Sequence, residues 1–119
     1  MRRKIQSAVC LALATALIST NAHSALTREQ QLKALDLRNA EVGALAHQLV
    51  TFKDANCPRQ TDAQVNDLLN SDFFYTMVAI QNALPEAAFD QLIDETYEYL
   101  TCDSEAHALT FVKTRLNIQ

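Results

Sequence analysis

The fold is decided by residues 61–100, which read TDAQVNDLLNSDFFYTMVAIQNALPEAAFDQLIDETYEYL. Apolar side chains recur along this stretch at intervals of three and four residues, the spacing of one buried face of an α-helix. The whole chain of 119 residues has one Gly and two Pro, too few for the many tight turns of an all-β domain. The sequence therefore predicts an all-α domain.

Hydroxyl side chains mark two helix starts inside this stretch. Thr61 and Gln64 form a capping-box signature, and Ser71 is a second N-cap residue. The inward side chains of the first helix are Val65, Leu68 and Leu69, and those of the second are Phe73, Phe74, Met77, Ile80 and Leu84. Asn70 and its neighbours either separate these two helices or kink a single one.

A third helix of the stretch begins at Pro85, whose fixed φ suits the first helical position. We expect this helix to stop near Thr101. Its inner side is predicted to carry Phe89, Leu92, Ile93, Thr96, Tyr97 and Leu100.

Two further helices flank the stretch. The earlier one runs from Thr27, which forms a capping box with Gln30, to about Asp54, and Gly43 inside it permits the close approach of another helix. The later one begins at Asp103 or Ser104, and its inward positions are Leu109, Val112 and Leu116, with Ala108 or Phe111. Four or five helices then form one small bundle over residues 25–119.

The first 24 residues have the pattern of a cleaved secretory signal peptide. A cationic start of Arg2, Arg3 and Lys4 precedes about a dozen apolar residues, and Ala22-His23-Ser24 satisfies the small-x-small cleavage rule. The apolar run is shorter than the roughly 20 residues that cross a bilayer. Cys10 lies at the front of this run and therefore does not become the lipid-bearing residue of a lipoprotein. We expect a periplasmic or secreted protein without membrane insertion.

Cleavage leaves two cysteines, Cys57 and Cys102, and an oxidising compartment favours their pairing. A bond that closes a 45-residue separation stabilises the folded chain by about 4 kcal/mol in the chain-entropy model. Neither cysteine has a neighbouring Cys or His at the spacing of a metal site. The sequence therefore predicts one disulfide that staples the bundle.

The charge balance of the exported chain is strongly acidic. Removal of three N-terminal cations leaves 7 basic residues against 14 acidic ones, a net charge of −7. Such a charge argues against binding to nucleic acid or anionic lipid and favours attraction to basic proteins.

Charge is also segregated, because no Lys or Arg occurs between Arg59 and Lys113. Within this interval four acids recur every four residues and form one helix face, which we call the acidic stripe: Glu86, Asp90, Asp94 and Glu98. The stripe is either a solvated face or a contact surface for a basic partner. In the first case its acids can also meet cations of the first helix, namely Arg28, Lys33, Arg38, Lys53 and Arg59.

Tyr97 and Tyr99 lie beside the stripe, and both cannot face inward on one helix. At least one of them should be exposed. An exposed tyrosine next to carboxylates suits the anchor of a protein interface.

No catalytic motif is present in the sequence, and we expect a protein that is not an enzyme and needs no cofactor. Exposed helical acids lack the raised pKa that a glycosidase general acid needs. The acids do not have the alternate spacing and central Gly of a calcium loop, and His47 and His107 stand alone on their helices, so no metal is implied.

The order of long helix, cysteine link, two or three helices and second cysteine resembles the small periplasmic pilotins of type II secretion. The resemblance rests on Cys57, Cys102 and the helical periodicity. It implies a disulfide-stapled bundle that holds an amphipathic helix of the secretin in an apolar groove. Many pilotins are lipoproteins, and this chain departs from them in having no lipid-acceptor cysteine after its signal.

Two other periplasmic classes are similar at the same level. Acid-stress chaperones are small, helical and carry a single disulfide, and immunity proteins against secreted toxins are often acidic helical bundles. The sequence thus predicts a protein-binding module whose partner has a basic site or an amphipathic helix, and it leaves these three roles open. A dimer would form if the apolar faces are broader than one bundle can bury.

Overall fold

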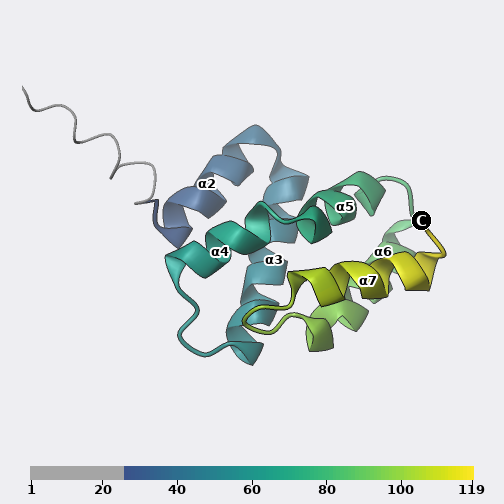
Figure 1. Ribbon diagram of the computed structural model, residues 1–119. Helices are drawn as coiled ribbons and strands as arrows, with labels where there is room; N and C mark the ends of the chain where they lie inside the picture. The colour runs from purple at the N-terminus through teal and green to yellow at the C-terminus, as the bar shows by residue number, and fades with distance from the viewer. Residues whose placement is uncertain (1–25) are drawn as a thin grey trace, which may run out of the picture.

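The computed structural model describes residues 26–119, and every regular element in this part of the chain is helical (Figure 1). The elements are α2 (Arg28–Arg38), α3 (Ala40–Asn56), α4 (Asp62–Leu69), α5 (Asp72–Gln81), α6 (Glu86–Thr96), the 3₁₀ helix η2 (Tyr97–Tyr99) and α7 (Glu105–Leu116). The predicted all-α bundle is confirmed. The predicted signal peptide, residues 1–24, and Cys10 within it lie outside the described residues.

The prediction of one long helix from Thr27 to about Asp54 is wrong, because Asn39 divides it into α2 and α3. The backbone of Asn39 is extended, with φ −162° and ψ 115°. Its side-chain oxygen accepts hydrogen bonds from the N–H groups of Glu41 and Val42 at 2.9 and 3.2 Å and so caps α3. Apolar spacing continues across this break, and periodicity alone therefore did not show it.

Helices α2 and α3 form an antiparallel pair. The start of α2 meets the end of α3, where Arg28 lies 2.5 Å from the carboxylate of Asp54. At the other end Gly43 lies against Asp36, and a Cβ at position 43 would come within 2.8 Å of the Cα of Asp36. The close helix approach predicted at this glycine is confirmed.

The predicted N-caps are observed at three helices. Thr27 with Gln30 and Thr61 with Gln64 each make both hydrogen bonds of a capping box. Ser71 caps α5 by accepting a backbone hydrogen bond at 3.1 Å. Because Ser71 begins a new helix, α4 and α5 are separate helices rather than one bent helix.

Helix α6 ends earlier than predicted. Pro85 is its N-cap residue, and after Thr96 the chain tightens into η2, where the N–H of Leu100 bonds the carbonyl of Tyr97 at 3.3 Å. A 3₁₀ turn has fewer residues than an α-turn, so the side chains that face the core change. Thr96 and Leu100 are fully buried as predicted, whereas the predicted inner position of Tyr97 is wrong, since 39% of that residue is exposed.

Helix α7 starts after Ser104, as predicted, but the serine hydroxyl does not cap it. That hydroxyl accepts a hydrogen bond from the N–H of Thr101 at 2.7 Å and donates to the carbonyl of Tyr99, so it closes the preceding turn instead. Of the predicted inward positions, Ala108 and Val112 are buried, and Leu109, Phe111 and Leu116 are partly buried.

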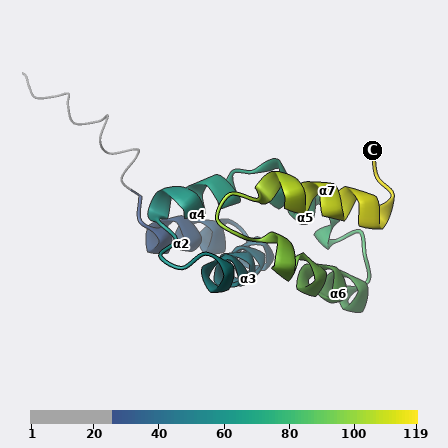
Figure 2. The ribbon, with the colours of Figure 1, turned by 60° about the horizontal axis from the view of Figure 1, so that its bottom comes forward.

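The core lies between two sides of the bundle. Figure 2 shows α3 and α6 along one side and α4, α5 and α7 along the other. Helix α5 contributes Phe73, Phe74 and Met77, all essentially inaccessible, and they pack with Leu49 of α3 and Leu92 of α6. Full burial of each such side chain stabilises the fold by about 1.5–3 kcal/mol.

Cys57 and Cys102 form the predicted disulfide, with Cα atoms 4.9 Å apart. The bond joins the link after α3 to the turn before α7. A disulfide of this kind is consistent with a periplasmic or extracellular protein. None of the helices in residues 26–119 has the length and hydropathy that a membrane span needs.

Candidate protein-interaction surface

The acidic stripe lies on the outer side of α6 and continues into η2. Glu86, Asp90 and Asp94 belong to α6, and Glu98 belongs to η2. All four residues are exposed. No Lys, Arg or His among residues 26–119 lies within 4.0 Å of any of these carboxylates. Within the described chain these four acids are therefore exposed and do not pair with cations of α2 or α3.

Neighbouring acids of the same interval do have partners. Glu95, one residue away from the stripe, lies 2.8 Å from Arg115 of α7. Asp62 accepts a hydrogen bond from the N–H of Arg28 at 3.0 Å. These two contacts join α6 to α7 and the start of α2 to the start of α4.

Tyr97 and Tyr99 are both partly exposed, at 39% and 38%, which confirms that at least one faces outward. Each ring rests on a phenylalanine. Tyr97 packs edge-on against Phe52 with centroids 5.2 Å apart, and Tyr99 stacks on Phe111 at 4.5 Å. These contacts hold the rings in place while part of each remains accessible, as in an interface anchor.

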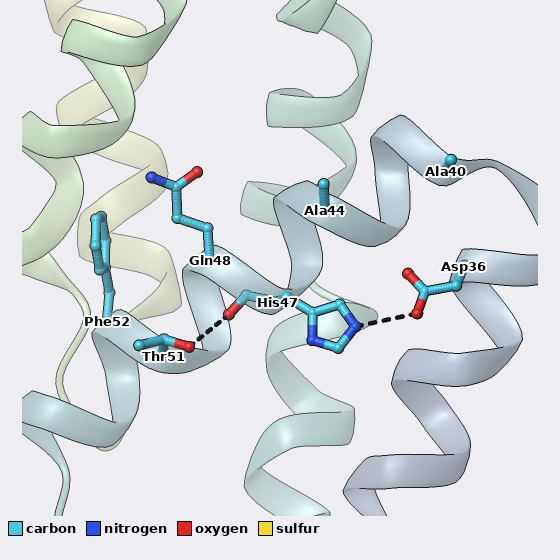
Figure 3. Close-up of a pocket in the computed structure, with 7 residues that line it drawn as sticks. All are labelled: Asp36, Ala40, Ala44, His47, Gln48, Thr51 and Phe52. Atoms are coloured by element: carbon cyan, nitrogen blue, oxygen red, sulfur yellow. Dashed lines mark hydrogen bonds and ion pairs between the residues drawn. The ribbon is translucent and has the colours of Figure 1, made fainter.

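Two hollows lie on the outer face of α3. One has a volume of about 580 Å³ and lies beside α2, and Figure 3 shows His47 reaching across it to Asp36. The His47 Nε2 and Asp36 Oδ2 atoms are 3.1 Å apart. The other has a volume of about 440 Å³ and lies between α3 and α6, where Glu86 and Asp90 meet Glu41 of α3. Sequence reasoning missed Glu41 because only the packed bundle brings α3 beside α6.

An apolar hollow of about 670 Å³ lies on another face, between α2 and the pair α4 and α5. Its apolar lining includes Leu26, Leu35, Val42, Leu69, Phe74 and Val78. A groove of this kind is what the resemblance to pilotins implies. Nothing in the structure shows what covers it.

The C-terminal end of α3 is closed by the disulfide and an internal ion pair, and we call it the stapled end. Lys53 is completely buried, although the sequence analysis named it among the cations that the acidic stripe could meet. Its Nζ atom donates to Glu105 of α7 at 2.5 Å and to the carbonyl of Gln64 at 3.3 Å. The pair joins three helices close to Cys57 and Cys102, because Lys53 and Glu105 lie four residues before the first cysteine and three after the second.

A second ion pair at this end, between Arg28 and Asp54, shifts the pKa of Asp54. Burial raises the pKa of Asp54, but hydrogen bonds from Arg28 and Gln60 and the charge of Arg28 outweigh it and hold that pKa below its ordinary value. The two bonds measure 2.5 and 2.7 Å. The carboxylate of Asp54 is therefore stabilised in its charged form.

Groups that suit metal binding are not assembled in residues 26–119. No three His, Cys, Asp or Glu side chains in that range are placed to hold a metal ion. Thr51 lies near His47, but its hydroxyl donates to the backbone carbonyl of His47 at 2.8 Å rather than to the imidazole ring. The exposed carboxylates and aromatic rings are the functional groups that this surface offers.

The chain matches no protein-family model, and neither a curated protein nor a solved structure is detectably similar to it.

Proposed function

We propose that this chain is an exported, non-enzymatic protein that binds a basic partner protein through the acidic stripe. One observation carries the proposal: three exposed carboxylates lie on one side of α6 and a fourth, Glu98, follows in η2, with no cation among residues 26–119 near enough to pair with them. Export is supported by the N-terminal signal pattern and by the Cys57–Cys102 disulfide.

The stripe suits rapid recognition of a positive surface. Its residues span about 18 Å along the helix axis, and like charges four residues apart repel one another. A basic partner removes this repulsion when it binds. Long-range attraction of this kind raises the association rate and sets the orientation of the complex more than it raises affinity.

Among the roles open to such a module, we favour a pilotin-like secretion accessory. The single Cys57–Cys102 disulfide that joins two ends of the helical bundle supports it, and the partner would be a helix or basic site of an envelope assembly. An immunity protein would use the same acidic surface on the basic site of a toxin. The identity of the partner protein distinguishes these two roles.

The test is affinity capture from an envelope extract with the exported protein, at low and at high salt. The variant Glu86→Gln, Asp90→Asn, Asp94→Asn, Glu98→Gln removes the stripe. A matched variant, Glu29→Gln, Asp67→Asn, Asp72→Asn, Asp103→Asn, makes the same charge change at four exposed acids elsewhere.

We expect one dominant partner that elutes with salt, is lost with the stripe variant and is retained with the matched variant. If both variants lose the partner equally, net charge alone explains the binding. That result would overturn the assignment of binding to the acidic stripe. Capture that does not depend on salt would also contradict the mechanism.

A second candidate function, an acid-stress chaperone, is favoured by the buried pair of Lys53 and Glu105. In acid strong enough to protonate Glu105, Lys53 would be a buried charge without its partner, a costly arrangement. The bundle would then loosen at α7 and expose apolar surface. Near-UV circular dichroism at about pH 3 together with protection of an acid-stressed client tests this, and intact packing at that pH rules it out.

A further inference from the structure

The two hollows on α3 are neighbours. Ala44 and Gln48 line both of them. Ala40, Ala44, Gln48 and Phe52 follow one another at four-residue intervals on the same side of α3. We call the depression over these four residues the α3 valley, and its floor extends over about 18 Å of helix.

The edges of the valley are acidic. Asp36 of α2 lines one side, and Glu41 of α3 with Glu86 and Asp90 of α6 line the other. No Lys or Arg is among the residues that line either hollow. His47 is the single basic group there, and its Nε2 atom is engaged by Asp36 at 3.1 Å.

The shape of the valley fits an elongated ligand. Ala40 and Ala44 are exposed and small, so the floor is low at this end and the backbone of a partner can come close. At the far end the floor rises at Phe52, which packs against Tyr97 and offers an apolar contact. Figure 3 shows Gln48 and Phe52 projecting from α3 away from the side on which His47 meets Asp36.

A metal ion does not fit these acids, because no three His, Cys, Asp or Glu side chains in residues 26–119 lie close enough together to hold one. A second copy of the chain does not fit either, because its net charge of −7 after cleavage would repel the acidic edges. A row of cations on a narrow, elongated scaffold satisfies both edges at once.

We propose that the α3 valley holds a basic amphipathic helix of the partner protein. Small side chains of that helix lie over Ala40 and Ala44, and its Lys and Arg residues reach Asp36 on one edge and Glu86 and Asp90 on the other. The inference rests on the proposed function and makes it more specific: the stripe attracts the partner, and the valley beside it recognises its helical shape.

The test uses two synthetic peptides of equal charge and the exported protein. One peptide, about 18 residues long, combines Ala and Lys at helical spacing. The other carries Pro in place of central Ala residues and so cannot form a continuous helix. Fluorescence anisotropy at low salt gives the affinity of each.

The protein variant that tests the site is Ala44→Phe, which fills the valley without changing charge. Ala40→Phe is a second variant at the end of the floor, and Ala106→Phe places the same bulk on an exposed position of α7. Circular dichroism of each variant shows whether it is folded.

We expect the helical peptide to bind about tenfold more tightly than the interrupted one, and Ala44→Phe or Ala40→Phe to remove about that advantage. Ala106→Phe should have no effect. Equal affinity of the two peptides, or full binding by both valley variants, would overturn the proposal.

The experiment distinguishes this proposal from the broader one. If the stripe variant loses the captured partner while the valley variants keep it, the acidic function stands and the valley is not its site. If the chain alone forms a dimer that Ala44→Phe dissociates, the valley belongs to a second copy and the proposal fails.

Discussion

The two ends of α3 use charge in opposite ways. At the stapled end, Lys53 and Asp54 have partners inside the molecule, one on α7 and one on α2. At the other end, Glu41 faces Glu86 and Asp90 across the second hollow, and none of these three carboxylates has a cation within 4.0 Å in residues 26–119. The same helix is thus closed by ion pairs at one end and left negatively charged at the other.

This difference separates charges that stabilise the bundle from charges that are available to a partner. Residues 26–119 contain seven Lys and Arg residues, and three of them join helices through ion pairs. Unpaired acids on one helix side repel one another and contribute nothing to the fold. Substitutions at the two ends should therefore change stability with opposite signs.

The largest loss is expected when the disulfide is removed. Cys57→Ala with Cys102→Ala should lower the free energy of unfolding by about 4 kcal/mol, because the unfolded chain is no longer constrained over 45 residues. Urea unfolding followed by circular dichroism measures the change. Reductant should reproduce it in the natural chain and do nothing to the double variant. Equal stability of the two proteins would show that the staple does not stabilise this end.

Removing the buried charge of Lys53 should destabilise the protein slightly less than removing the disulfide. Lys53→Met should lower the free energy of unfolding by about 3 kcal/mol, because the carboxylate of Glu105 is left without its charged partner. The matched control is Lys33→Met, at an exposed lysine, which should have little effect. Adding Glu105→Gln to Lys53→Met should restore part of the loss. Similar stabilities for the two lysine variants would show that the Lys53–Glu105 pair does not stabilise the stapled end.

On the acidic stripe, reversing a charge should stabilise the protein. Asp94→Lys should raise the free energy of unfolding by about 1 kcal/mol, because repulsion from Asp90 and Glu98 is replaced by attraction. Asp67→Lys on α4 makes the same charge change without an acid three or four residues away, and it should gain less. High salt should reduce the difference between the two variants. A loss of stability in Asp94→Lys would mean that the acidic stripe supports the fold.

The smallest effect concerns the exposed pair of Arg28 and Asp54. Asp54→Asn should cost about 0.5 kcal/mol at pH 7, the size expected of a partly solvated ion pair. Since the pKa of Asp54 is lowered by folding, this stability is present above the ordinary value of 3.8 and disappears as the pH falls through the lowered one. Unfolding at several pH values measures it, and Arg28→Met should remove most of the pH dependence.

Local patterns in the sequence predicted most of the helices. Thr27, Thr61 and Ser71 cap helices where their hydroxyl groups predict caps, because this interaction involves only the next few residues. Asn39 is also an N-cap residue, but the apolar periodicity on both sides of it favoured a continuous helix. The 3₁₀ turn at Tyr97 was missed because it depends on how the end of α6 packs against its neighbours.

The candidate site was predicted only in part. The spacing of Glu86, Asp90, Asp94 and Glu98 is visible in the sequence, since a four-residue interval places side chains on one helix side. The sequence did not decide whether these four acids are exposed or pair with cations of α2 and α3, because that depends on how the helices pack. Lys53 illustrates the difficulty, because a lysine is rarely buried and nothing near it in the sequence marks Glu105 as its partner.

By itself, the sequence determined the helical class, the cysteine pairing and the excess of acidic charge, because these follow from composition, from short-range spacing and from the presence of just two cysteines outside the predicted signal peptide. The tertiary structure decided which acids are paired and which remain exposed. It also decided that α3 lies beside α6 and forms the acidic valley between them. Both outcomes depend on contacts between residues tens of positions apart, which only the packing of the whole bundle brings together.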